Sequence, residues 1–597
     1  MKSSTRNPRT KRVNRIIIWS LATVLAVLIV SAGWVAIRAT MVKDALETVL
    51  PLTSKLQSQI LASDASGAAS TSKEITAKAS LAASYSSDVV WRVYENVPRL
   101  GVNLTAVRGL SNAIDVMAST VLQPLAKVAG DLNVDAFRPK DGAINAAPLL
   151  TVQPAIAQIT SQLTLSDARV QAINTTDTIG AIVAAKNKLQ AAIARALPEL
   201  EAVNRATALL PGMLGGTGPR NYLLLVQNPA ELRSGGGIPG ALALIHAENG
   251  RIKLAQQSST AQFPQYPEPV VPLSPETLSL YGKLPGLYLQ NVTMTPHFTE
   301  TANLAAEMWR LKTGQTVDGV LSIDPIALSY ILKATGAITL ATGDVIDTNN
   351  VVKVLLSDVY ERYVKPADQD LFFASAAKSI FETVAEGKFK PELLLSALTQ
   401  AGDERRILIW SAHPSEQKSL ASTTLAGGLP QSTTTERPFG VFLNDATGSK
   451  MDYYLSVKYA IGQSVCRVDG RPNYALDITL TNTAPLNAAT SLKRYVTGGG
   501  EFGVTPGHIR TNISIYAPND DVQGLKAERD GSELRYKLGF DSGRQVLLSI
   551  VELAPGQSTT MRFNFLSESP SDAIATIVST PLISTHKITE ALVLCEF

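Results

Sequence analysis

The run Ile16–Ile37, IIIWSLATVLAVLIVSAGWVAI, decides how the rest of the chain is organised. It contains 22 residues and no charged side chain. A helix of this length, at a rise of about 1.5 Å per residue, crosses a hydrocarbon core of roughly 30 Å. Trp19 and Trp34 lie near its ends, where amphipathic rings favour the membrane interface. The run therefore predicts a transmembrane anchor over residues 16–37, with a lipid bilayer as the chain's first partner.

Charges on the two sides of this run predict its orientation. Residues 1–15 form a basic tail with no acidic residue, whereas Arg38 and Lys43 beyond the run are balanced by Asp44 and Glu47. The positive-inside rule then places the N-terminus in the cytoplasm and the bulk of the chain outside the cell membrane, as a single-pass protein. A cleaved signal peptide is the alternative, but it normally has a shorter apolar core and an A-x-A-like cleavage site.

Composition excludes several classes of partner. The net charge of +3 arises from 54 basic and 51 acidic residues, a balance that gives no reason to expect nucleic acid. The five histidines are scattered, and no pair has the spacing of metal ligands. We therefore expect no metal site and no cofactor.

The exported part divides into three regions that differ in residue composition and in the spacing of apolar residues. Residues 38–210 are rich in Ala, Ser, Thr and Leu with apolar residues at helical spacing, which predicts a helical bundle in which Pro98, Pro124 and Pro139 interrupt helices. Residues 217–430 alternate strand and helix patterns, including the buried strand Asn221–Gln227 and a hairpin that turns at Asn249-Gly250. This alternation predicts an α/β domain.

Short β-branched runs separated by Gly- or Pro-bearing turns fill residues 438–597 and predict an all-β sandwich of immunoglobulin-like type. This region holds the only two cysteines of the chain, Cys466 and Cys595. In an oxidising compartment outside the cytoplasm, two cysteines of one domain favour a disulfide, and two free buried thiols are the alternative.

The segment Arg233–Gly240, RSGGGIPG, is the most unusual local sequence. Glycines such as Gly235, Gly236 and Gly237 allow backbone N–H groups to approach an anion closely, and Arg233 adds positive charge. The segment matches neither a Walker nor a Rossmann spacing. A tight turn at a sheet edge is the alternative to a phosphate- or sugar-binding loop.

Catalytic residues are harder to identify. Asp324 precedes Pro325 and is explained by capping of a helix N-terminus, whereas Asp318 in TVDGV has no such local explanation and is a turn residue or faces a cleft. No serine lies in a G-x-S-x-G elbow, and no Cys–His pairing is indicated. The sequence therefore assigns no catalytic residue.

Four blocks together resemble the domain-of-unknown-function 4012 family of membrane-anchored envelope proteins from Gram-positive bacteria. They are RNYLLLVQNPAELRSGGGIPGALAL, TVDGVLSIDPIALSYILKATGAITL, RRILIWSAHPSEQKSL and LNDATGSKMDYYL. The family carries no assigned activity, so this resemblance implies location and architecture only.

A more distant likeness connects the α/β domain to the LytR–CpsA–Psr glycopolymer transferases, which move a polyprenyl-pyrophosphate-linked glycopolymer onto the cell wall with Arg, Asp and a divalent metal. Where those enzymes have R-S-D, this chain has Ile238-Pro239-Gly240, and Ser258-Ser259-Thr260 stands in place of P-R-D. Their arginine-rich turn is reduced to Arg362. The resemblance thus implies a related fold without the groups that hold a metal and a pyrophosphate.

Three functions follow as hypotheses. The first is a non-catalytic envelope protein that binds a cell-wall glycopolymer, a polyprenyl-linked saccharide or an envelope partner, with Arg233, Gly235, Gly236, Gly237, Asp318 and Arg362 as candidate ligand-binding residues. The second is a divergent transferase that uses Arg233, Asp318 and Arg362. The third is a structural or adhesive surface protein. Acids and arginines converging on one cleft would favour the enzyme.

Overall fold

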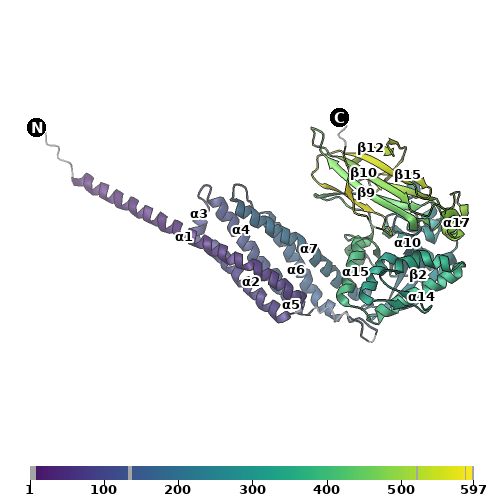
Figure 1. Ribbon diagram of the computed structural model, residues 1–597. Coiled ribbons are helices and arrows are strands. Elements are labelled where there is room, and N and C mark those ends of the chain that lie inside the picture. The colour runs from purple at the N-terminus through teal and green to yellow at the C-terminus, as the bar shows by residue number, and fades with distance from the viewer. Residues whose placement is uncertain are drawn as a thin grey trace. The chain divides into compact units, whose positions relative to one another are not determined.

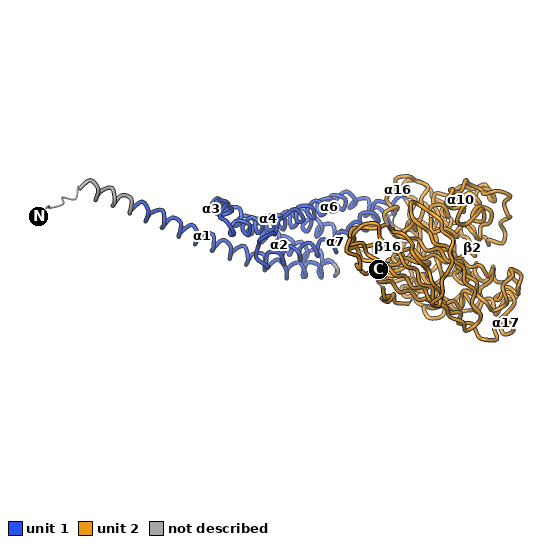
Figure 2. Tube along the Cα trace, turned by 90° about the horizontal axis from the view of Figure 1, so that it is seen from above, with its two compact units in different colours: residues 1–137, 145–212 blue, residues 138–144, 213–597 orange. Residues whose placement is uncertain are grey.

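The chain forms two compact units in a computed structural model that describes residues 8–62, 64–131, 138–140, 142–518, 522–584 and 586–593. Unit 1 comprises residues 1–137 and 145–212, and unit 2 comprises residues 138–144 and 213–597 (Figure 2). A short segment of the predicted helical region thus belongs to unit 2, where Ile144 donates its N–H to the Gly250 carbonyl at 2.9 Å.

Unit 1 is helical, as its sequence predicts. Its helices are α1 (Pro8–Leu61), α2 (Ala65–Ser86), α3 (Val89–Tyr94), α4 (Gly101–Met117), α5 (Gln123–Asp131), α6 (Ala147–Gln171) and α7 (Gly180–Met213). Pro98 falls between α3 and α4, but Pro124 lies inside a continuous helical run. The turn of π-helix at Ala118–Leu122 accommodates it, because a wider turn relieves the clash of the proline ring with the preceding carbonyl.

Helix α1 has two differently packed halves (Figure 1). Beyond Ser31, buried residues recur every three to seven positions at Val35, Val42, Ala45 and Val49, the spacing of one packed helix face. Residues 19–30 are exposed instead, although all but two are apolar. In the described part of the chain, α1 is the one helix long and apolar enough to cross a membrane.

The α/β part of unit 2 contains a five-stranded mixed sheet in the order β3-β2-β1-β4-β7. Its strands are β1 (Arg220–Asn228), β2 (Ile238–Glu248), β3 (Arg251–Ser259), β4 (Gly319–Ile323) and β7 (Ile407–Ser411). Strand β1 is parallel to β4, and the β2–β3 hairpin turns at Asn249 and Gly250, which both have positive φ. The helices are α8 (Pro275–Tyr281), α9 (Leu284–Leu287), α10 (Phe298–Thr313), α11 (Pro325–Thr335), α12 (Val351–Lys353), α13 (Val359–Arg362), α14 (Pro366–Ala385), α15 (Pro391–Asp403) and α16 (Pro414–Leu420), and β5 (Ile338–Thr339) pairs with β6 (Val345–Ile346).

The C-terminal part of unit 2 is β-rich and contains two sheets, ordered β13-β12-β16-β10-β9-β18 and β14-β15-β11-β8-β17. Phe439 on one sheet lies 5.0 Å, ring centre to ring centre, from Phe565 on the other, so the two sheets share an aromatic core. The immunoglobulin-like assignment stays a prediction. The strands are β8 (Glu436–Asp445), β9 (Leu455–Ser464), β10 (Asn473–Asn482), β11 (Ile509–Tyr516), β12 (Val522–Arg529), β13 (Ser532–Glu533), β14 (Lys537–Asp541), β15 (Arg544–Leu553), β16 (Ser558–Ser567), β17 (Ile574–Ser579) and β18 (Thr589–Glu590), with short helices α17 (Ala488–Ser491) and α18 (Arg494–Thr497).

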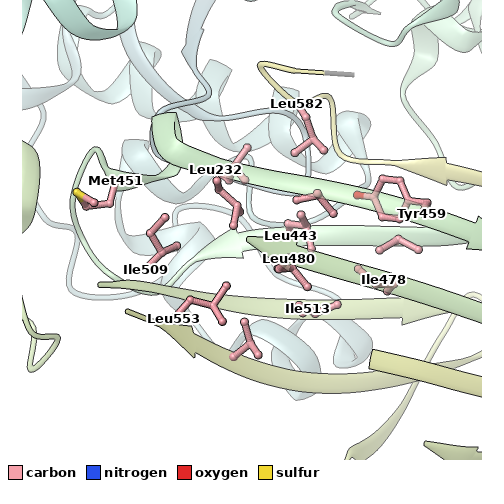
Figure 3. Close-up of a cluster of buried hydrophobic side chains, with 14 of the residues drawn as sticks. Leu232, Leu443, Met451, Tyr459, Ile478, Leu480, Ile509, Ile513, Leu553 and Leu582 are labelled. Atoms are coloured by element: carbon pink, nitrogen blue, oxygen red, sulfur yellow. The ribbon is translucent and has the colours of Figure 1, made fainter. Parts of the chain in front are cut away.

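One hydrophobic core crosses from the α/β part into the β-rich part. Leu232 of the α/β part packs into the same cluster as Leu443, Leu480 and Leu582 (Figure 3). Cys595 lies outside the described residues, so its pairing with Cys466 stays a prediction. The continuous core places the loop that follows Leu232 at the seam between the two parts.

Candidate functional site

Five consecutive backbone N–H groups of the loop Arg233–Gly240 are already hydrogen-bonded within the protein. All five amides from Ser234 to Ile238 donate to protein oxygens at 2.8–3.2 Å. The acceptors are Asn444 Oδ1, the Thr293 carbonyl, the Arg233 carbonyl, Gln227 Oε1 and the Glu231 carbonyl, in that order. An anion would therefore have to displace protein acceptors to reach these donors.

The glycines of this loop allow close packing against the end of β1. A Cβ atom added to Gly237 would lie 2.3 Å from the Asn228 carbonyl oxygen, a separation that real Cβ atoms do not reach. Gly236 has φ of +128°, and a Cβ atom there would lie 2.2 Å from Gln227 Oε1. These positions need glycine because the backbone passes so close to its neighbours.

Arg233 is bound within the protein. Its guanidinium donates to the Leu232 carbonyl at 2.9 Å, to Asn291 Oδ1 at 3.0 Å and to the Asp445 carbonyl at 3.3 Å. Its charge also faces the buried carboxyl of Asp452. Burial, and after it the neighbouring Asp445, raises the pKa of this carboxyl well above its ordinary value. Arg233 thus links the loop to the β-rich part and balances buried acids.

Asp318 and Arg362 lie elsewhere. Asp318 precedes β4 and accepts from the Asn221 N–H at 2.8 Å and from His413 Nε2 at 2.9 Å. Asp318 contacts Asn221 at one end of β1, and the Arg233 loop packs against Asn228 at the other end. At a rise of about 3.3 Å per residue, the length of β1 separates Asp318 from this loop by more than about 20 Å. Arg362 is an exposed residue that pairs with Asp344 at 2.6 Å. The structure does not bring Arg233, Asp318 and Arg362 together.

A cavity of about 750 Å³ lies where the α/β part meets the β-rich part. The α/β part contributes the turn Asp403–Arg406 and two loops, residues 421–424 and 428–431. The β-rich part contributes residues of β9, the segment 577–582 and His586. This volume is that of a site for a small molecule or for a few sugar residues.

Arg405 supplies an uncompensated positive charge to this cavity. It has positive φ (+58°), so it reverses the chain between α15 and β7 in a conformation that a side chain normally disfavours. Its guanidinium donates to the Gly428 carbonyl, and no carboxylate of the described residues lies within ion-pair distance. Burial lowers the pKa of Arg405, which reflects a charge that has lost water without gaining an anion.

The next residue, Arg406, shows the opposite arrangement. Its side chain is 1% exposed and binds Asp324 and Glu404, each at 2.7 Å, and it also donates to the Leu582 carbonyl at 2.7 Å. Arg406 is therefore fully paired inside the protein. Of the two acids at the cavity, Glu404 is used in this pair, and Asp403 is exposed to water, which screens its charge.

The rest of the lining combines apolar side chains, among them Leu429, Val457 and Ile577, with neutral polar groups. The polar groups belong to Ser422, Thr423, Thr424, Gln431 and Ser542, and His297 is held by a hydrogen bond from Nε2 to Asp541 at 2.9 Å. Hydroxyl and amide groups around one arginine can bind a polyhydroxyl ligand that carries an anionic group. No cluster of three or more His, Cys, Asp or Glu side chains suited to a metal occurs among the described residues.

None of the cavity residues was a candidate from the sequence. The Arg405-Arg406 pair lies in one of the four blocks that carry the family resemblance, but its two members look alike in the sequence. The two arginines differ because Asp324 is buried beside Arg406 and pairs with it, which makes Arg406 structural and leaves Arg405 available to a ligand.

No curated protein and no solved structure matches the chain. The likeness to the LytR–CpsA–Psr transferases therefore stays a prediction. Residues 217–360, which hold β1 to β4 and the glycine-rich loop, match the family model described as a protein of unknown function (DUF4012), so the chain carries the domain-of-unknown-function 4012 that its sequence blocks indicate.

Proposed function

We propose that this chain is a membrane-anchored binding protein of the cell envelope, whose unit 2 lies outside the cytoplasm. Helix α1 supplies the anchor, and the basic residues that precede its apolar run favour a cytoplasmic N-terminus. The cavity beside Arg405 is the ligand site of this proposal. The ligand class is an anionic saccharide, either a cell-wall glycopolymer or a saccharide linked to a polyprenyl phosphate.

Arg405 is the observation that carries the proposal. A guanidinium in a partly dehydrated cavity, without a carboxylate at ion-pair distance, gains more from an anionic ligand than one in water does. The surrounding hydroxyl and amide side chains match the hydroxyl groups of a sugar. The cavity replaces the glycine-rich loop as the proposed ligand site, because the amides of that loop are already occupied.

The transferase hypothesis has less support from this geometry. Its residues Arg233, Asp318 and Arg362 lie in three separate environments, each with protein partners. A purely structural or adhesive role does not use the cavity at all. Binding without catalysis therefore fits the arrangement best.

The test is a calorimetric titration of the detergent-solubilised full chain with a phosphate-bearing envelope glycopolymer. We expect Arg405→Gln to weaken binding by about tenfold, since a charged hydrogen bond contributes roughly 1.5–3 kcal/mol. Arg362→Gln is the matched control, because Arg362 is an exposed arginine of the same unit outside the cavity. Equal binding by wild type and Arg405→Gln would contradict the proposal.

A further inference from the structure

The connection between α2 and α4 packs against the apolar part of α1. Tyr94 Oη donates to the Leu28 carbonyl at 3.1 Å and lies 2.8 Å from Ser31 Oγ. Trp91 and Val35 are buried in one cluster with partly buried Val90 and Tyr94 (Figure 1 shows α3 beside α1). Residues 89–94 therefore lie beside the last turns of the apolar run Ile16–Ile37.

The depth of this contact follows from helix geometry. Ser31 precedes Ile37 by six residues, which places it about 9 Å along the helix inside the end of the apolar run. If the hydrocarbon ended at Val30, only 15 residues of the apolar run, about 22 Å of helix, would remain to cross a core of roughly 30 Å. A complete crossing by α1 thus requires α3 to enter the same layer.

The side chains of this connection suit entry into lipid. Val89 is 78% exposed and Val93 is 60% exposed, and Val97 and Leu100 are also exposed. Two polar groups at the same level are paired inside the protein, since Tyr94 binds α1 and Asp88 binds Trp34 Nε1 at 2.9 Å and Arg38 at 3.1 Å. Paired polar groups with outward apolar side chains are what a hydrocarbon environment demands.

A groove continues this apolar surface onto α1. Its volume is about 430 Å³, and it lies between Val90 and the α1 residues Ala26, Val27, Val30 and Trp34. Arg92 and Arg99 of the same connection are exposed, and long arginine side chains can extend from an apolar surface to lipid phosphate groups.

We propose that residues 89–100 form a membrane-inserted tip of unit 1, whose apolar side chains contact lipid acyl chains and whose groove along α1 holds one of them. The tip fixes unit 1 against the bilayer surface beside its own anchor. This inference rests on the anchoring of α1 in the proposed function, but it does not depend on the cavity or on any ligand of unit 2.

The test measures the depth of single fluorophores in the full chain, reconstituted into vesicles of phosphatidylcholine and phosphatidylglycerol. In a Cys466→Ser and Cys595→Ser background, an environment-sensitive dye is attached through Val27→Cys in α1, Val93→Cys in the tip or Leu150→Cys in α6. Leu150, an exposed apolar residue near the start of α6, is the matched control. The other end of α6 lies near the tip, since Ile179 in the connection that follows α6 donates its N–H to Asn103 Oδ1 of α4 at 2.8 Å. Leu150 is about 30 Å along α6 from that end.

We expect nitroxide-labelled acyl chains to quench the dyes at Val27 and Val93 strongly, with blue-shifted emission, and to leave the dye at Leu150 unquenched. Quenching at Val27 with none at Val93 would overturn the tip alone. Absence of quenching at Val27 would overturn the anchor, and the tip with it. A dye attached through Val89→Cys repeats the tip measurement at a second exposed position and guards against local distortion.

Discussion

The glycine-rich loop Arg233–Gly240 and the turn Glu404–Arg406 both place an arginine where the chain changes direction, but the two arginines have opposite environments. Arg233 donates three hydrogen bonds to protein oxygens, and the amides that follow it are occupied as well. Arg405 has one protein acceptor and a cavity beside it. The conspicuous glycine-rich loop thus serves packing, whereas the ordinary-looking turn that holds Arg405 leaves the charge of this arginine available to a ligand.

The largest expected effect concerns Arg406, the paired neighbour of Arg405. Arg406→Leu should lower the free energy of unfolding by about 3–5 kcal/mol, because it leaves the carboxylate of Asp324 buried without its cation. Chemical denaturation followed by circular dichroism measures this loss. Arg405→Leu, one residue earlier, should cost less than about 1 kcal/mol, and equal losses in the two variants would remove the contrast between them.

Gly237→Ala should destabilise the protein by about 3 kcal/mol, since the new Cβ would meet the Asn228 carbonyl and the backbone would have to move. Gly240→Ala in the same loop is the control, because its Cβ would lie 3.9 Å from the nearest neighbouring atom, Asn228 Cβ, an ordinary contact. Thermal unfolding compares the two. Similar melting temperatures would show that the loop is not as closely packed as described.

Arg233→Ala should cost about 2 kcal/mol of stability and leave ligand binding intact, because Arg233 holds the seam between the two parts of unit 2 and does not line the cavity. The measurement pairs a denaturant titration with the calorimetric titration used for Arg405→Gln. A variant that keeps its stability and loses binding would restore the glycine-rich loop as the ligand site.

The smallest effect is a pH dependence from Asp452. Its raised pKa in the folded state means that the folded protein holds a proton that the unfolded chain releases near pH 4. This carboxyl therefore favours folding at low pH, and its contribution falls as pH rises from about 4 towards the folded pKa. Asp452→Asn should flatten the decline of the melting temperature over that interval, and an unchanged profile would contradict the assignment.

A control for the pH series lies on the surface. Arg467 and then Arg471 lower the pKa of Asp469 to about 2, so this carboxylate favours folding above pH 4 and loses its effect as pH falls towards 2. Asp469→Asn should therefore leave the profile above pH 5 unchanged.

Much of the architecture could be predicted from the sequence because it follows local patterns. The apolar run of α1, the helical region, the β1 strand and the Asn249-Gly250 hairpin each have a period or a turn residue that identifies them. Pro124 could not be placed, since a π-turn several residues earlier accommodates it. The shared core around Leu232 depends on contacts between residues more than 200 positions apart.

The candidate site could not be predicted for a related reason. Glycines signal backbone freedom, but the sequence does not say whether a ligand or a neighbouring strand occupies the space they open. The difference between Arg405 and Arg406 depends on Asp324, 82 positions from Arg406, which caps α11 by accepting from the Ala327 N–H and also binds Arg406. Capping therefore explains only part of what Asp324 does.

The most direct measurement of the central claim is native mass spectrometry of the full chain, released gently from the membranes of the organism that makes it. We expect wild-type protein to carry an added mass that fragments into sugars with a phosphate or carboxylate group. Arg405→Gln, expressed at the same level and equally folded, should lose this mass, and Arg233→Ala should retain it. An added mass that survives in Arg405→Gln but disappears in Arg233→Ala would contradict the account.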